Sequence, residues 1–145
     1  MIDLSGKTIL VAGASGLLGS HTTIALAECG ARVIPTYHRS MSFLLGMVTG
    51  IKSDLKIEQA VKLDVTDSNS INQLVKVIKA MDGIDGFVNC VGVNRPASFE
   101  DITLEDWVEV LDVNLTGQFM VTQALLPLIR NGGSIVFVGS VSGHI

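Results

Sequence analysis

The chain has 145 residues, 48% of them hydrophobic, and therefore fits a single domain with a buried core. Its net charge of -4 and the absence of a basic run argue against a nucleic-acid partner. No apolar stretch reaches the length of a membrane span and the first residues lack the charged and apolar regions of a signal peptide, so we expect a cytoplasmic protein without membrane contact.

Runs rich in Val and Ile alternate with helical patterns, which predicts an α/β fold with helices on both faces of a parallel sheet. The five predicted strands cover residues 8–12, 32–36, 60–64, 86–90 and 134–138. The predicted helices cover residues 17–29, about 41–48, 68–81 and, as a long pair, 104–130, with Gly30, Gly83 and Gly132 as helix stops. Because glycines interrupt the second helix, residues 46–54 are expected to be frayed helix followed by a loop.

Right-handed crossovers would order these strands 3-2-1-4-5 in a doubly wound sheet. Ligands of such sheets bind outside the carboxyl ends of the strands, here where the first and fourth strands lie side by side. We therefore expect functional residues in the segments that follow the strands, namely 13–19, 37–40, 64–65, 89–92 and 139–142.

A glycine-rich segment joins the first strand to the first helix, with a spacing that differs from the G-x-G-x-x-G dinucleotide fingerprint. A helix that begins directly after a strand presents unpaired N–H groups and a positive dipole end, which bind anions. Gly13 is expected to make a tight turn, Gly16 to let the backbone approach a pyrophosphate, and Gly19 to let the helix pack closely. The candidate phosphate-binding residues are Gly13, Ser15, Gly16, Leu17, Leu18 and Gly19. The alternative is a turn that serves packing alone.

The segments that follow the later strands resemble, in order, motifs of the short-chain dehydrogenase/reductase family. Asp64 and Val65 resemble its adenine-contacting Asp-Val pair. Its Asn-Asn-Ala-Gly signature is matched by Asn89, Cys90, Val91 and Gly92. Asn114 falls on its catalytic asparagine and Ser140 on its catalytic serine. The resemblance runs over the whole chain and implies a Rossmann-like, NAD(P)-binding domain over residues 1–145 that belongs to an oxidoreductase of carbonyl groups or secondary alcohols.

Two departures from that family leave alternatives open. Gly16 comes one place earlier than in the classical G-x-x-x-G-x-G, and this spacing resembles the extended subfamily, which acts on nucleotide-sugars. The family's Tyr-x-x-x-Lys pair follows the serine, whereas this sequence ends at Ile145 with Tyr37 as its one tyrosine. We therefore expect an incomplete domain that lacks later strands and helices, leaves its fifth strand at an open edge, and is inactive alone. A noncatalytic nucleotide-binding or interaction module is the third alternative.

The end of the second strand indicates which cofactor is bound. Tyr37 stands where an Asp or Glu would accept hydrogen bonds from the adenosine ribose, and His38, Arg39 and Ser40 follow it. A guanidinium and a hydroxyl suit a 2′-phosphate, so we predict NADP(H) over NAD(H). The alternative is a solvated arginine in a loop.

Each polar candidate has a structural alternative. Asp64 is expected either to contact the adenine or to cap the following turn. Asn89 is expected to hydrogen-bond to the backbone across the sheet, a role that is compatible with cofactor binding. Asn114 is expected either at a helix kink, where its carbonyl would bind a water for proton relay, or at a break between two helices. Ser140 bonds the substrate carbonyl, or only ends a strand.

The remaining residues suggest packing more than chemistry. Cys29 and Cys90 are expected to be reduced, buried thiols, and no metal site is predicted because His21, His38 and His144 lack partners at ligand spacing. Trp107 lies on an apolar face and is expected in the core or in a subunit interface. By the resemblance, the 104–130 helices would form a homo-oligomer.

Overall fold

Five parallel strands form the centre of the computed structural model, which describes residues 2–49 and 55–140. They are β1 (Thr8–Ala12), β2 (Arg32–Tyr37), β3 (Val61–Lys62), β4 (Ile84–Asn89) and β5 (Ile129–Phe137). Their order in the sheet is β3-β2-β1-β4-β5, and every neighbouring pair is parallel. The predicted doubly wound α/β fold and its strand order are confirmed.

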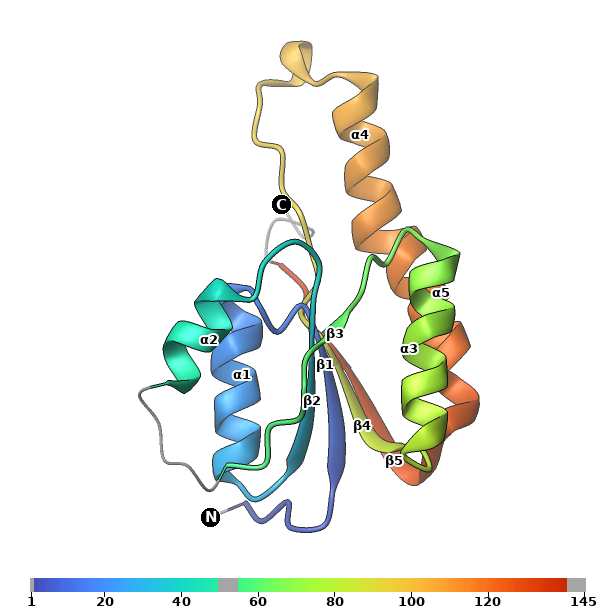
Figure 1. Ribbon diagram of the computed structural model, residues 1–145. Coiled ribbons are helices and arrows are strands. Elements are labelled where there is room, and N and C mark those ends of the chain that lie inside the picture. The colour runs from blue at the N-terminus through green and yellow to red at the C-terminus, as the bar shows by residue number, and fades with distance from the viewer. Residues whose placement is uncertain (1, 50–54, 141–145) are drawn as a thin grey trace.

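Helices cover both faces of this sheet (Figure 1). One face carries α1 (Leu17–Glu28) and α2 (Ser42–Val48), and the other carries α3 (Ser68–Ala80) and α5 (Gly117–Leu125). Successive side chains of β1 point to opposite faces of the sheet. Leu10 and Ala12 pack with α3 and α5, whereas Ile9 and Val11 pack on the opposite face. All five residues of this central strand are buried, which is why it has the continuous apolar sequence of a strand covered on both faces.

Helix α3 forms where its sequence pattern predicts it. The Asp67 carboxylate accepts the Asn69 N–H at 2.9 Å and caps the first turn. Ile71, Leu74 and Ile78 are buried along one face. The chain then leaves the helix through Gly83, whose φ of +86° only glycine adopts without strain.

The predicted long helix pair over residues 104–130 is partly wrong. Helix α4 (Leu104–Leu111) passes through a π-helical turn, Asp112–Thr116, into α5, so no break occurs at Asn114. After a 3-10 turn at Leu126–Leu128, β5 begins at Ile129, so Ile129 and Arg130 are strand rather than helix. Pro127 lacks an N–H and contributes to this end of the helix.

Gly132 was predicted to stop a helix and instead lies inside β5. Ile84 of β4 pairs with Ile129 of β5, and Gly86 pairs with Ser134. A step of two residues along β4 thus corresponds to a step of five along β5, so β5 bulges there. Gly132 has a φ of +79° in this bulge, which explains why a glycine is found at that place.

The remaining strand and loop boundaries lie closer to the predicted ones. β3 is shorter than residues 60–64, although the Leu63 N–H still donates to the Tyr37 carbonyl at 2.8 Å. Helix α2 continues through Gly46 to Val48, and residues 50–54 of the predicted loop lie outside the described residues.

The connection after β4 and helix α4 form an arm that projects past the carboxyl ends of the strands (Figure 1). Several of its large apolar side chains are exposed, namely Phe99, Ile102, Leu104 and Trp107. Trp107 is 56% exposed, so of the two places expected for it the core is wrong. The arm brings α4 over the edge of the sheet at which ligands of doubly wound folds bind.

Candidate functional site

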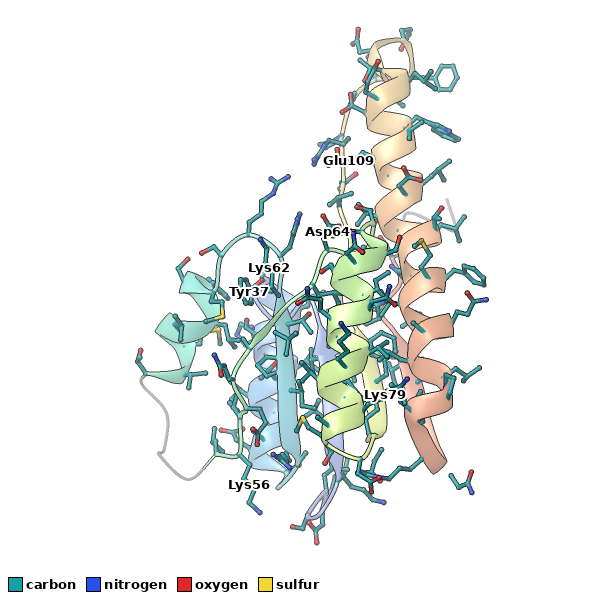
Figure 2. All side chains as sticks on the ribbon, turned by 45° about the vertical axis from the view of Figure 1, so that its right-hand side comes forward. Tyr37, Lys56, Lys62, Asp64, Lys79 and Glu109 are labelled. Carbon is teal, nitrogen blue, oxygen red and sulfur yellow. The ribbon has the colours of Figure 1, made fainter. Side chains whose placement is uncertain are left out.

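The carboxyl ends of the strands and α4 enclose a cleft of about 990 Å³. Most of the predicted cofactor residues line it: Gly13, Ser15, Gly16, His38, Arg39, Ser40, Asp64, Val65, Cys90, Val91 and Gly92. Figure 2 shows Tyr37 and Asp64 at this end of the molecule with Glu109 above them, whereas Lys56 and Lys79 lie toward the other end. The sheet order brings these residues together because β1 and β4 are adjacent at its switch point.

Packing explains two of the three motif glycines. Gly13 has a φ of +74°, and a Cβ there would lie 3.0 Å from the Cys90 backbone. A Cβ on Gly19 would lie 2.1 Å from the Gly13 carbonyl oxygen, so the start of α1 packs on the turn and not on the strand alone. At Gly16 a Cβ would meet Gly13 O at 3.4 Å, an ordinary contact, so the fold does not demand a glycine there. The open space over Gly16 therefore suits a ligand that approaches the backbone.

The start of α1 borders the cleft without a side-chain cap. Gly16 is its N-cap in extended conformation, no side chain caps the helix, and its first turn holds no acidic residue. The Gly13 N–H donates to the buried Thr36 Oγ1 at 3.1 Å, which ties the turn to the end of β2. Leu17 and Leu18 are exposed and, with Gly19, do not line the cleft.

Asp64 connects the ends of β2 and β3. Its Oδ1 accepts the N–H and the hydroxyl of Thr66, at 2.9 and 2.7 Å, and its Oδ2 lies 3.3 Å from His38 Nε2. Burial raises the pKa of this carboxyl, but the Thr66 hydrogen bonds and His38 lower it more, so Asp64 is ionised at neutral pH. Asp64 thus caps the turn that follows β3, as the structural alternative predicts. Its contact with His38 gives that imidazole a carboxylate partner that the spacing of the sequence does not indicate.

Arg39 and Ser40 form the wall of the cleft between β2 and α2. Within the described residues the Arg39 guanidinium has no hydrogen bond or ion pair. Ser40 Oγ accepts the Ser42 N–H at 3.1 Å and lies 2.8 Å from Ser42 Oγ, which holds the start of α2. The same cleft is thus lined by the start of α1 and by a guanidinium that has no acidic partner among the described residues.

The two residues at the end of β4 are placed by local contacts. Asn89 is buried, and its Oδ1 accepts the Val91 N–H at 3.0 Å, so it bonds backbone two residues onward and not across the sheet. Its Nδ2 finds no partner among the residues that the structure describes. Burial raises the pKa of the Cys90 thiol, against a smaller effect of a Thr22 hydrogen bond, so this thiol stays protonated in the cleft wall.

Neither of the two predicted catalytic residues lines the cleft. Asn114 lies in the π-helical turn, where its side chain bonds the backbone of Val93. Ser140 is exposed and does not line the cleft. Residues 142–143 and His144, which the sequence places after it, lie outside the described residues.

Sequence reasoning missed the wall of the cleft that the arm provides. Its chemical groups come from Arg95 on the connection, from Glu105 and Glu109 on α4, and from Asp112 at the start of the π-helical turn. The three acidic residues follow i, i+4, i+7 spacing and so share one helix face, a signal that was present in the sequence. That this face meets the cleft depends on the course of residues 90–103, which have no periodic pattern.

None of the helices within residues 2–49 and 55–140 has the length and hydropathy needed to cross a bilayer. In the same ranges, no three His, Cys, Asp or Glu side chains are grouped so that they could hold a metal ion.

Comparison with known proteins identifies the family. The sequence model of the family described as short chain dehydrogenase matches residues 7–145. A 3-oxoacyl-(acyl-carrier-protein) reductase of Synechocystis is 34% identical over 99% of this chain and 59% of its own length. The corresponding enzyme of Thermotoga maritima is 37% identical over 97% of this chain and 58% of its own length.

Solved structures agree with these sequence matches. A dehydrogenase/reductase from Sinorhizobium meliloti superimposes with a TM-score of 0.89 at 29% identity, over 99% of this chain and 57% of its own. A short chain dehydrogenase from Burkholderia cenocepacia, crystallised with NADP, gives a TM-score of 0.84 at 34% identity, over 95% of this chain and 57% of its own. The chain thus spans somewhat more than half the length of these relatives. It belongs to the short-chain dehydrogenase family.

Proposed function

We propose that this chain is the cofactor-binding part of an NADP(H)-dependent oxidoreductase that reduces carbonyl groups or oxidises secondary alcohols. One observation carries the proposal: the uncapped start of α1 at Gly16 lines the same cleft as the Arg39 guanidinium, which has no ion pair within residues 2–49 and 55–140. A dinucleotide with a 2′-phosphate has two anionic groups, and the cleft offers one cationic or dipolar partner for each.

The residues of the cleft divide between the parts of such a cofactor. Gly13, Gly16 and the first turn of α1 would hold the pyrophosphate. Arg39 and Ser40 would bind the 2′-phosphate, and Asp64 would lie at the adenine, with one oxygen already used by Thr66. The complex of the Burkholderia cenocepacia relative with NADP supports this choice of cofactor.

When bound, the nicotinamide supplies or accepts the hydride. The chain's own part is to fix the dinucleotide along the carboxyl ends of β1 and β4. Asn114 and Ser140 would act on the proton and on the substrate carbonyl, roles that rest on the family motifs. Tyr37 is the one tyrosine of the sequence and lies on β2, so the residues present favour binding over turnover.

A nucleotide-sugar enzyme of the extended type is the second candidate, and the early position of Gly16 favours it. Binding of a uridine diphosphate sugar to the cofactor-loaded protein would favour this second candidate over the first.

Calorimetric titration of NADPH and NADH into the Arg39→Ala variant tests the cofactor assignment. Hydrogen bonds to a charged group contribute about 1.5–3 kcal/mol, so loss of Arg39 should raise the Kd of NADPH by about tenfold or more and leave that of NADH unchanged. Arg32→Ala is the matched control, because Arg32 lies at the opposite end of β2 and pairs with Glu58. An equal effect of Arg39→Ala on both cofactors would refute the assignment.

A further inference from the structure

An extended segment after β4, residues 91–95, forms one wall of the cleft, and side chains of the helices hold it at alternate residues. Gln118 Nε2 donates to the Val91 carbonyl at 3.0 Å. Asn114 accepts the Val93 N–H through Oδ1 and donates to the Val93 carbonyl through Nδ2, each at 2.8 Å. These contacts fix the part of the segment that lies nearest to β4.

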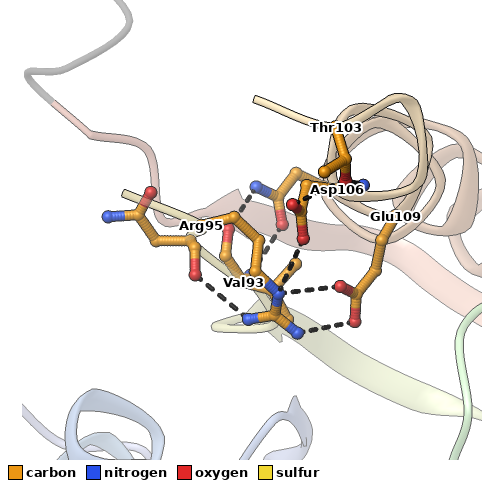
Figure 3. Close-up of polar contacts among 7 residues, drawn as sticks. Val93, Arg95, Thr103, Asp106 and Glu109 are labelled. Atoms are coloured by element: carbon orange, nitrogen blue, oxygen red, sulfur yellow. Dashed lines mark hydrogen bonds and ion pairs between the residues drawn. The ribbon is translucent and has the colours of Figure 1, made fainter. Parts of the chain in front are cut away.

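The outer end of the segment is held by an ion pair with α4. Arg95 Nε and Nη2 donate to the two carboxylate oxygens of Glu109 at 2.8 and 2.7 Å (Figure 3). Arg95 Nη1 donates to the Asn94 carbonyl at 3.1 Å, and Asp106 Oδ1 lies 3.9 Å from Nε. The two-point contact fixes the direction of the guanidinium as well as its distance from the helix.

The spacing of these contacts follows from backbone geometry. Alternate residues of an extended segment lie about 6.6 Å apart, and one helical step of four residues advances about 6 Å. Asn114 and Gln118 are such a step apart, whereas the π-helical turn Asp112–Thr116 adds one residue between Glu109 and Asn114. The turn therefore brings all three side chains to the same extended segment.

We propose that Arg95 and Glu109 form a positioning pair that fixes the 91–95 segment as a wall for the dinucleotide. The inference rests on the proposed function. A carboxylate in a cleft that receives an anionic cofactor is unfavourable by charge alone. Glu109 is thus useful to binding only through the order that it imposes on Arg95 and on Val91–Val93.

This argument predicts the sign of an effect. Glu109→Met removes both hydrogen bonds to Arg95 and should raise the Kd of NADPH up to about fivefold, the equivalent of an ion pair of about 1 kcal/mol. Glu105→Met is the matched control, because Glu105 also lines the cleft from α4 and makes no hydrogen bond or ion pair with the described residues. Its loss should leave the Kd unchanged or lower it.

The charge-reversed double variant Arg95→Glu with Glu109→Arg should recover most of the lost affinity, because it re-forms the pair. Tighter NADPH binding in both Glu109→Met and Glu105→Met would overturn the proposal, since the charge of this wall alone would then determine the affinity. Failure of the double variant to recover affinity would overturn it too.

Hydrogen exchange of the Val93 amide, measured by NMR without cofactor, judges the positioning independently of the proposed function. Glu109→Met should accelerate this exchange severalfold, and Glu105→Met should not. Weaker NADPH binding with unchanged exchange would overturn the proposal by showing that Glu109 acts on the cofactor directly. If the unaltered protein binds no NADPH, the proposed function falls, and faster exchange in Glu109→Met would still support the positioning of the segment.

Discussion

The backbone of Gly19 lies so close to the Gly13 carbonyl that a Cβ on Gly19 would be 2.1 Å from that oxygen. Gly19→Ala must therefore displace α1 from the turn, and we expect it to lower the free energy of unfolding by several kcal/mol or to prevent folding. Urea unfolding followed by circular dichroism measures the effect. Gly46→Ala is the control, because a Cβ there meets nothing within 4 Å and alanine favours the helix interior.

Gly16→Ala should behave differently from Gly19→Ala. A Cβ on Gly16 makes only an ordinary contact at 3.4 Å, so stability should change by less than about 1 kcal/mol. The added methyl group would stand where we place the pyrophosphate, so NADPH binding should weaken by at least about tenfold. Unchanged affinity in a folded Gly16→Ala protein would contradict the assignment of the turn.

Asn114→Leu should destabilise the fold as well as the cleft. The variant leaves the N–H and the carbonyl of Val93 without their partners, and unpaired groups of this kind cost about 1–3 kcal/mol. Asn72→Leu, at an exposed position of α3, is the control. Equal unfolding midpoints in urea for the two variants would show that the Asn114 contacts contribute nothing.

Asp85 should make stability depend on pH in the acid range. Its carboxylate accepts the Thr8 N–H at 2.8 Å and forms ion pairs with Arg130 and Lys7. The hydrogen bond from Thr8 and, to a smaller extent, the two positive charges lower the pKa of Asp85, whereas burial opposes this shift. A lowered pKa in the folded state stabilises the protein above the ordinary carboxyl value of about 4, and this contribution is lost as pH falls through the folded-state pKa.

Asp85→Asn should therefore destabilise the protein at pH 7, and the difference from the unaltered protein should shrink below about pH 4. Unfolding in urea between pH 7 and pH 3 measures it. Asp82→Asn is the control, since asparagine tolerates its φ of 60° and its side chain has no hydrogen bond or ion pair among the described residues. A difference for Asp85→Asn that is the same at every pH would contradict the argument.

The apolar surface of α4 and α5 should drive self-association. Leu104, Trp107, Leu111, Leu115 and Phe119 recur at helical spacing and are 38% to 72% exposed. Leu115→Asp should lower the mass measured by light scattering toward that of a monomer. Leu45→Asp, on α2 and similarly exposed, should not. A monomer before substitution would refute the interface.

The fold could be predicted because its strongest patterns are local. β1 is buried along its whole length and reads as one apolar run, and α3 has a cap at Asp67 and a buried face at helical spacing. Crossover handedness then determined the order of the strands. Ile129 and Arg130 were assigned to a helix because the chain there has no break visible in periodicity, whereas pairing with β4 decided the outcome.

The candidate site could be predicted where it follows the strand ends and not where it depends on distant contacts. Gly13, Arg39 and Asp64 were found because parallel strands end at one edge of the sheet. The pairing of His38 with Asp64, and of Arg95 with Glu109, joins residues that no local pattern relates. Such contacts are set by the course of the connections, which have little periodicity to read.

Calorimetric titration of NADPH into the unaltered 145-residue protein, with NADH titrated in parallel, tests the central claim most directly. We predict saturable binding of one NADPH per chain, with NADH weaker by about tenfold or more because it lacks the phosphate that Arg39 would bind. Absence of NADPH binding to the folded protein, or equal affinity for the two cofactors, would contradict it.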